Sequence, residues 1–192
     1  MKLHPLLFLG LLLLGSSCND KYPIDELPDD TTPPSLTYPF LSFSSTQQFI
    51  TFGDSLNGGL CKGYWFQMLD SNQSVAAAAP GIVTGIAQQA GGAKSISIKY
   101  KSNSIYSFEY AHLRDVTVEV NDIINSGTIL GKTGQGGKLY FQLIKNDTEV
   151  FCPKTFGSPG FNTAVEQAIQ KHNINYPLDT IDEPCAVQSL PR

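Results

Sequence analysis

The chain has 192 residues, which suits one domain with appendages and is enough to bury a hydrophobic core. Hydrophobic residues make up 41% and charged residues 16% of the sequence, an ordinary balance for a globular protein. The net charge of −4 supplies no overall basic field. The composition therefore argues against nucleic acid and against an anionic membrane surface as partners.

Residues 1–17 have the features of a signal peptide. Lys2 precedes an apolar run, residues 6–14, which is too short to cross a bilayer as a helix of a mature protein. The run ends in the small residues Gly-Ser-Ser, directly followed by Cys18. This ending resembles the lipobox of bacterial lipoproteins, in which the cysteine carries the lipid. The alternative is a plain secretory signal with an incidental cysteine.

Residues 18–38 are predicted to form a tether. The segment is acidic, lacks hydrophobic periodicity and contains four prolines: Pro23, Pro28, Pro33 and Pro34. Such a composition buries too little apolar surface to order itself, and its prolines keep it extended. We therefore expect the membrane link to consist of the lipid anchor alone.

Residues 39–158 are predicted to form an all-β domain. Short apolar segments alternate with turns rich in Gly and Asn or Asp. The predicted strands lie within residues 48–66 and at residues 75–79, 82–87, 95–100, 104–110, 116–120, 128–130 and 139–143. Strict alternation in residues 95–100 and a short connection to residues 104–110 predict a hairpin. Many short strands at even spacing indicate a compact antiparallel sandwich or barrel-like fold.

Residues 159–192 have a different pattern. One short helix is predicted over residues 162–172, with Asn162 or Thr163 as its cap. Its apolar face would consist of Val165, Ala168 and Ile169. The remaining residues are expected to form an extended tail on the surface.

The cysteines other than Cys18 are Cys61, Cys152 and Cys185. An exported chain meets an oxidising compartment, so one disulfide with one leftover thiol is expected. Pairing of Cys152 with Cys185 would fix the tail, whereas pairing of Cys61 with either one would fix the loop before Lys62. Three free buried cysteines are the remaining alternative.

Three signatures in the chain follow one another in a characteristic order. They are VAAAAPG from Val75 to Gly81, YAHL from Tyr110 to Leu113, and VEVNDIINSGTILG ending at Gly131. In this order they resemble the LytM/lysostaphin-type peptidoglycan endopeptidases, over roughly residues 49–153. The valine and glycine pattern alone is also similar to the biotinyl/lipoyl hybrid sandwich. The resemblance implies a LytM-like, hybrid-sandwich antiparallel β fold with one short C-terminal helix.

The residues that carry the chemistry of that family are replaced here. Its enzymes hold zinc with a His-x-x-x-Asp pair and the second His of a His-x-His triplet, and the corresponding positions are Lys62, Phe66 and Tyr140. A lysine ammonium and a phenyl ring offer no lone pair, and a tyrosine ligates only after losing a proton with a pKa near 10. The lone family histidine is kept as His112, and Lys138 stands where the first triplet histidine would be. The resemblance thus implies a pseudoenzyme with no metal, no cofactor and only a vestigial His112.

The same alignment predicts a groove without metal. Its candidate binding residues are Lys62, Trp65, Phe66, His112, Lys138 and Tyr140. Lys62 and Lys138 are expected to lie near each other and to bind a carboxylate, beside aromatic rings that offer a stacking surface. The alternative is that the lysines are solvated and the aromatic side chains belong to the core.

These observations predict a non-catalytic cell-envelope lipoprotein, anchored to the outer membrane and facing the periplasm or the cell surface. Its expected partner is peptidoglycan or a cell-wall hydrolase that it regulates. One alternative is a divergent zinc endopeptidase with unusual ligands such as Cys61, Asp70 and His112. The other is a structural subunit of a surface lipoprotein complex.

Overall fold

The structure, a computed structural model, describes residues 28–175, 185 and 189–192. The predicted signal peptide and the expected lipid site at Cys18 lie outside the described residues. No helix in the described part of the chain is long and apolar enough to cross a membrane.

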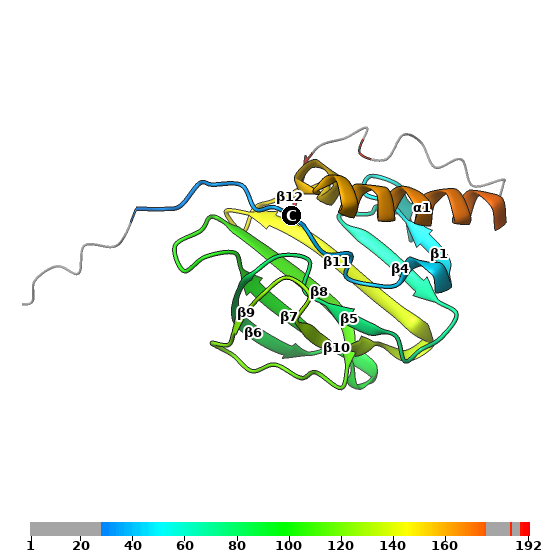
Figure 1. Cartoon of the computed structure of the whole chain (residues 1–192), viewed down its shortest axis with the longest axis horizontal. Coiled ribbons are helices and arrows are strands. Elements are labelled where there is room, and N and C mark those ends of the chain that lie inside the picture. The colour runs from blue at the N-terminus through cyan, green and yellow to red at the C-terminus, as the bar shows by residue number, and fades with distance from the viewer. Residues whose placement is uncertain (1–27, 176–184, 186–188) are drawn as a thin grey trace, which may run out of the picture.

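The fold is built on one large antiparallel sheet (Figure 1). The order of its main strands is β1-β4-β11-β8-β7-β6-β9. Their bounds are Thr46–Ile50 for β1, Tyr64–Met68 for β4, Gly81–Gln88 for β6, Lys94–Lys99 for β7, Tyr106–Arg114 for β8, Ile123–Ile124 for β9 and Lys138–Lys145 for β11. The predicted all-β class is thereby confirmed.

Shorter elements complete the sheet. β5 (Ser74–Ala76) pairs with β10 (Ile129–Thr133), which also pairs with the end of β8. β12 (Glu149–Phe151) joins β11 to β13 (Ser189–Pro191), and β2 (Ser55–Leu56) forms a separate hairpin with β3 (Gly59–Leu60). The helical segments are the 3-10 turns η1 (Phe43–Ser45), η2 (Ala90–Gly92), η3 (Gln135–Gly137) and η4 (Pro153–Phe156), and the α-helix α1 (Pro159–Asn175).

The predicted hairpin is formed by β7 and β8, with Ile98 opposite Phe108. The strand predicted for residues 116–120 is wrong, because this segment is a loop. Its amide groups bind elsewhere: the Thr117 N–H donates to the Leu130 carbonyl at 3.1 Å, and the Glu119 N–H to the Asp122 carboxylate at 2.8 Å.

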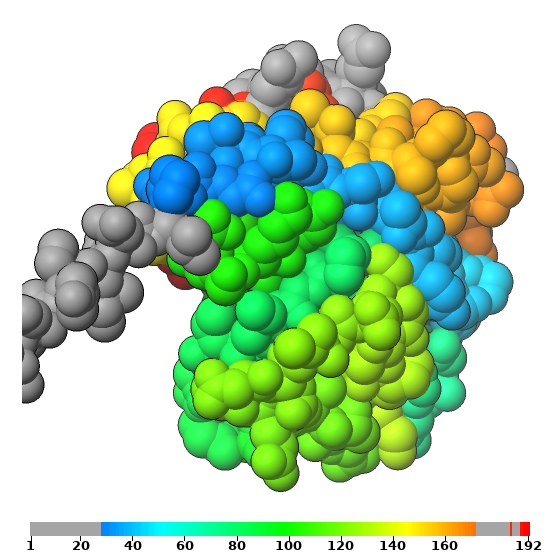
Figure 2. Space-filling model, turned by 60° about the vertical axis from the view of Figure 1, so that its left-hand side comes forward, coloured from blue at the N-terminus to red at the C-terminus, as the bar shows by residue number. Residues whose placement is uncertain are grey.

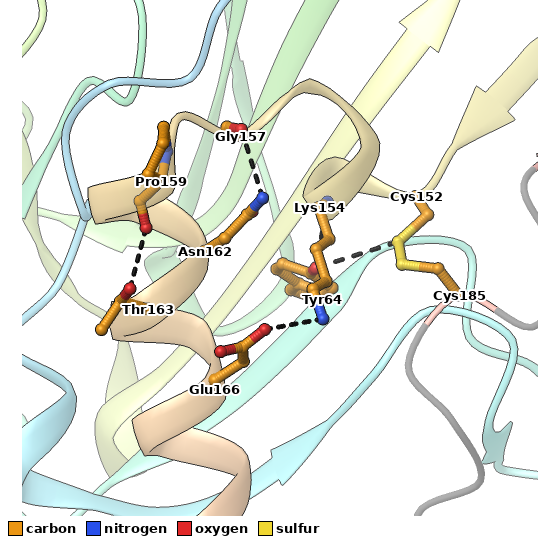
Figure 3. Close-up of polar contacts among 9 residues, drawn as sticks. All are labelled: Tyr64, Cys152, Lys154, Gly157, Pro159, Asn162, Thr163, Glu166 and Cys185. Atoms are coloured by element: carbon orange, nitrogen blue, oxygen red, sulfur yellow. Dashed lines mark hydrogen bonds and ion pairs between the residues drawn. A yellow bond between two sulfur atoms is a disulfide. The ribbon is translucent and has the colours of Figure 1, made fainter.

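Helix α1 begins earlier than the sequence pattern predicts. The hydroxyl of Ser158 accepts the Phe161 N–H at 3.3 Å, and Pro159 occupies the first helical position, where its missing N–H costs nothing. The predicted caps have other roles (Figure 3). Asn162 donates its side-chain amide to the Gly157 carbonyl at 3.2 Å, and the Thr163 hydroxyl donates to the Pro159 carbonyl at 2.9 Å.

The core lies between the sheet and a layer formed by α1 and the N-terminal segment. Aromatic rings from both sides meet there: Phe40 lies 4.8 Å from Phe141 and 5.9 Å from Phe161, measured between ring centroids. Phe161 and Val165 of α1 are fully buried. The helix and the β domain therefore share one core, and the predicted boundary between residues 158 and 159 does not separate two folded units.

The tether prediction is wrong for its last part, residues 28–38. Leu36 is fully buried and its N–H donates to the Phe156 carbonyl at 2.9 Å. Asp30 forms an ion pair with Lys101 at 2.6 Å. Figure 2 shows this segment in blue, lying across the surface of the domain. Prolines favour extended backbone without preventing it from docking, and one buried leucine supplies an anchor.

The structure pairs Cys152 with Cys185, with their Cα atoms 5.7 Å apart, and leaves Cys61 as a buried thiol (Figure 3). The structure therefore shows neither a disulfide with Cys61 nor three free cysteines among the described residues. Beside the disulfide, the Tyr64 hydroxyl accepts the Lys154 N–H at 3.1 Å. Residues 189–191 are extended as predicted and pair with β12, with Leu190 opposite Val150.

Candidate functional site

A groove lies on the face of the sheet that points away from the core. It consists of two hollows of about 510 and 480 Å³ that share His112 and Lys138. The first hollow is also lined by Gln48, Ile50, Leu56, Asn57, Trp65 and Gln67. The second is also lined by Ala90, Gly91, Ala93, Gln135 and Gly136. We call this surface the groove; the β2–β3 hairpin borders one side and the η2 and η3 turns the other.

The pairing of β4 with β11 decides which side chains face the groove. Lys138 lies opposite Gln67, and Tyr140 lies opposite Trp65. Directly opposed residues in an antiparallel pair point to the same face of the sheet. Trp65, Gln67, Lys138 and Tyr140 are therefore on the groove side, and none of the four is fully buried.

Phe66 was predicted to line the groove and does not. Successive side chains of a strand point to opposite faces, so Phe66 turns into the core when Trp65 and Gln67 face the groove. Its exposed fraction is 0%, and its ring stacks on that of Phe49 with centroids 4.4 Å apart. The position that the family resemblance aligned with a zinc-binding aspartate is therefore a core position here.

The structure places Lys138, but not Lys62, among the residues that line the groove. Lys138 lies opposite Gln67, and Lys62 precedes Gln67 by five residues (67 − 62 = 5). Lys62 lies in the bend before β4, outside the ladder that β4 forms with β11. Lys62 lines neither hollow, and its carbonyl accepts the side-chain amide of Gln142 at 3.1 Å. Lys138 is the cation of the groove.

His112 lies at a distortion in β8. The preceding Ala111 pairs with Tyr140 of β11, whereas the following Leu113 pairs with Thr133 of β10. At this change of partner the backbone of His112 has a φ of 62°, in the left-handed region. Such a conformation costs a non-glycine residue about 1–3 kcal/mol, and inside a strand it marks a candidate functional position. The Gln89 side chain supports it by accepting the His112 N–H at 2.9 Å.

The surroundings of His112 favour its neutral form. Burial lowers the pKa of the imidazole below its ordinary value of 6.5, and the ammonium of Lys138 lowers it further. The unfolded chain takes up this proton at higher pH than the folded protein does. This group therefore makes the free energy of unfolding decrease as the pH falls below 6.5.

We expect Lys138→Ala to raise the pKa of His112 while leaving it below 6.5, because burial is the larger cause. An NMR titration of the imidazole measures this change. Lys145→Ala removes the same charge from the far end of β11 and is the matched control. Equal shifts in both variants would mean that Lys138 does not act on His112 locally.

The residues of the groove do not fit a zinc ion. Lys138, Trp65 and Gln67 are not zinc ligands, and burial raises the pKa of Tyr140 far above its ordinary value, so its phenolate does not form near neutral pH. No three His, Cys, Asp or Glu side chains come together as a metal site in the described residues.

The unusual ligand set considered from the sequence is likewise not assembled. Burial raises the pKa of the Cys61 thiol to about 11, and its sulfur contacts the Gly63 carbonyl at 3.2 Å. The Asp70 carboxylate accepts the Asn72 N–H at 2.9 Å in a local turn. Neither residue lines either hollow of the groove, where His112 lies.

The sequence reading missed several groove residues. Gln67 was not predicted, although its neighbour Trp65 was, and both line the first hollow. Gln48 and Ile50 enter the groove because β1 pairs with β4 at the edge of the sheet, with Ile50 opposite Trp65. Gln89 gives no local sign of its contact with His112, because the two residues are far apart in the chain.

Comparison with known proteins agrees with this architecture. Residues 61–152 match the model of peptidase family M23. The solution structure of lysostaphin is 21% identical and has a TM-score of 0.53; the match covers 70% of this chain and 56% of that one. The structure of the SpoIIQ–SpoIIIAH pore-forming complex gives 18% identity and a TM-score of 0.53, covering 71% of this chain and 99% of that one.

The catalytic domain of lysostaphin from Staphylococcus simulans is 24% identical, with a TM-score of 0.46 and coverage of 56% of this chain and 86% of that one. No curated protein sequence matches the chain. The β-rich sheet and its groove thus define a peptidase-like domain. Residues 61–152 are matched to peptidase family M23, and the predicted resemblance to the LytM/lysostaphin-type peptidases is confirmed.

Proposed function

We propose that the chain is a non-catalytic member of this family, in which the old active-site groove binds peptidoglycan instead of cleaving it. The observation that carries the proposal is the set of side chains around His112. The groove is kept, but Lys138, Trp65 and Gln67 line it where hydrolysis would require metal ligands, and Tyr140 lies on the same face of the sheet without lining either hollow. A neutral histidine in a groove without such ligands has no activated water to deprotonate.

These side chains suit a peptide that ends in a carboxylate. The exposed Lys138 ammonium can hold an anionic group, and the Trp65 ring offers an apolar platform beside it. The carboxamides of Gln48 and Gln67 can each donate to a peptide carbonyl and accept from a peptide N–H. The groove therefore offers recognition of both charge and backbone.

Co-sedimentation of the purified protein with peptidoglycan sacculi tests this function. Lys138→Ala and Trp65→Ala are each expected to weaken binding about tenfold, since each removes a central contact worth roughly 1.4 kcal/mol. Two variants serve as controls. Lys62→Ala removes a cation outside the groove, and Lys145→Ala removes one from the same strand, where its ammonium lies 5.8 Å from the Phe151 ring. Neither should change the bound fraction.

Two results would contradict the proposal. Unchanged binding by both groove variants would place the wall contact elsewhere. Release of soluble wall fragments by the zinc-loaded protein, abolished by a chelator, would show an endopeptidase instead. A stable protein partner without any affinity for sacculi would favour the structural subunit.

The proposal includes a lipid anchor at Cys18 and a place at the outer membrane. Its support is the sequence alone, where small residues precede the cysteine after a short apolar run. Detergent-phase partitioning of the protein made in bacterial cells tests the anchor. Recovery of the unchanged protein in the aqueous phase would count against it.

A further inference from the structure

A second pocket, of about 490 Å³, lies on the sheet away from His112 and Lys138. Its floor carries three hydroxyl side chains from neighbouring strands: Thr84 from β6, Ser97 from β7 and Ser107 from β8. We call it the hydroxyl pocket. It shares no lining residue with the groove, so nothing in the proposed function assigns it a role.

Two walls of the hydroxyl pocket come from outside the M23 match, residues 61–152. One is Asp29, which lies next to Asp30; the Asp30 N–H donates to the Asn103 carbonyl at 2.7 Å. The other is Arg192, whose N–H donates to the Thr148 carbonyl at 2.7 Å. The pocket is thus completed by segments that this chain adds to the family domain.

The pairing of β13 with β12 and the disulfide hold Arg192, the second wall of the pocket, in place. β13 pairs with β12, and the Arg192 guanidinium reaches the Glu109 carboxylate at 3.5 Å. Cys152, directly after β12, is bonded to Cys185, which precedes β13 (Figure 3). The disulfide reduces the conformational freedom of the C-terminal segment, and this favours the observed position of Arg192.

The charges in the hydroxyl pocket are balanced. Among the lining residues, Lys99 and Arg192 are positive and Asp29 and Asp147 are negative, and the Arg192 guanidinium is already paired with Glu109. A site for phosphate or another small anion would concentrate positive charge instead. The balance favours a ligand without net charge that offers both donors and acceptors.

The hydroxyl groups point to the same ligand class. The Thr84 hydroxyl donates to the Ser97 carbonyl at 3.2 Å and keeps its lone pairs as acceptors. The Ser97 and Ser107 hydroxyls have no hydrogen-bond partner among the described residues, so each can donate and accept. Ser97 lies opposite Glu109 and Ser107 lies opposite Lys99, so the two serines are diagonal neighbours roughly 7–8 Å apart, a spacing that a ligand of more than one sugar ring can bridge.

We propose that the hydroxyl pocket binds a neutral saccharide of two or three units. Its volume lies within the range of about 300–1,000 Å³ that is usual for small-molecule sites. Thr84, Ser97 and Ser107 hold the ring hydroxyls from below. Asp29 and Arg192 close over the ligand from the two added segments.

Isothermal titration of the full chain with cellobiose, maltotriose and N,N′-diacetylchitobiose tests the proposal. At least one of them is expected to bind with a Kd of about 1 mM or lower. Ser97→Ala, Thr84→Val and Arg192→Ala should each weaken that binding about fivefold or more, because Ser97 and Arg192 can donate to the ligand and Thr84 can accept from it. Lys138→Ala in the groove and Thr155→Val on the exposed η4 turn are the matched controls and should bind as the unmodified protein does.

Failure of all three saccharides to bind overturns the proposal, and so does binding that the pocket variants leave unchanged. Titrations with inorganic phosphate and with glycylglycine separate the other chemistries. Pocket-dependent binding of phosphate or of this zwitterion without saccharide binding also overturns it. Because Lys138→Ala affects only the groove, failure here and failure of the wall-binding function are distinguishable.

Discussion

Replacing Gly137 with alanine is expected to destabilise the protein by about 3 kcal/mol or more, measured as the free energy of unfolding in denaturant. Two costs add at this position. Gly137 has a φ of 72°, which costs an alanine roughly 1–2 kcal/mol. An added Cβ would also collide with the backbone carbonyl of Met68 in β4, which has no freedom to move aside.

Gly136→Ala is the matched control. Its φ of 71° imposes the same backbone cost, but an added Cβ meets no atom within 4 Å. Its loss should therefore be only about 1 kcal/mol. Equal losses in the two variants would show that the η3 turn does not pack against β4, and the groove would then be less rigid than described.

Phe66→Ala is expected to cost about 4 kcal/mol of unfolding free energy, whereas Trp65→Ala should cost about 1 kcal/mol. Phe66 is fully buried between Phe43 and Phe49, so its removal leaves a cavity in the core. Trp65 is half-buried on the groove face, where solvent fills the space that it leaves. Denaturant unfolding of the two variants measures both effects.

The pair of variants also tests the orientation of β4. If the strand were turned by one residue, Phe66 would face the groove and Trp65 the core. The order of the two stabilities would then be reversed. Only with the described orientation does the same variant, Trp65→Ala, keep its stability and lose affinity for sacculi.

The sequence predicted those elements whose local pattern of apolar and polar residues is compatible with only one kind of secondary structure. Residues 95–100 alternate strictly, and only a few residues separate them from residues 104–110, so the β7–β8 hairpin follows from pattern and distance. The family signatures likewise predicted the sheet and its groove. The helix α1 was found because its apolar residues recur at helical spacing, although its start required the Ser158–Pro159 cap.

The orientation of β4 could not be read in the same way. Tyr64, Trp65 and Phe66 are consecutive aromatic residues, so both faces of the strand look apolar. Alignment with an enzyme then assigned Phe66 to the site, and only the pairing of Trp65 with Tyr140 decides otherwise. The false strand at residues 116–120 has the opposite cause: its alternation is regular, but apart from the bond from the Thr117 N–H to the Leu130 carbonyl of β10 it forms no ladder with a described strand.

Contacts between distant residues were beyond any local reading. The left-handed backbone of His112 depends on the change of partner strand and on the hydrogen bond to Gln89. The residues next to His112 in the sequence predict neither of them. The docking of residues 28–38 was hidden by prolines and acidic residues, because it depends on the burial of Leu36 and on the ion pair of Asp30 with Lys101, which join residues far apart in the chain. Both features depend on the packing of the whole domain.

If the proposed lipid is attached at Cys18, the docked segment limits how far the folded domain can lie from a membrane. With the proposed lipid at Cys18 and the domain contacts beginning near Pro28, ten residues (28 − 18 = 10) separate anchor and fold. Ten residues span at most about 35 Å, less than half of the roughly 75 Å that an undocked tether to residue 39 would allow. The module would then sample only a thin layer next to the bilayer, and a ligand farther out would have to come to it.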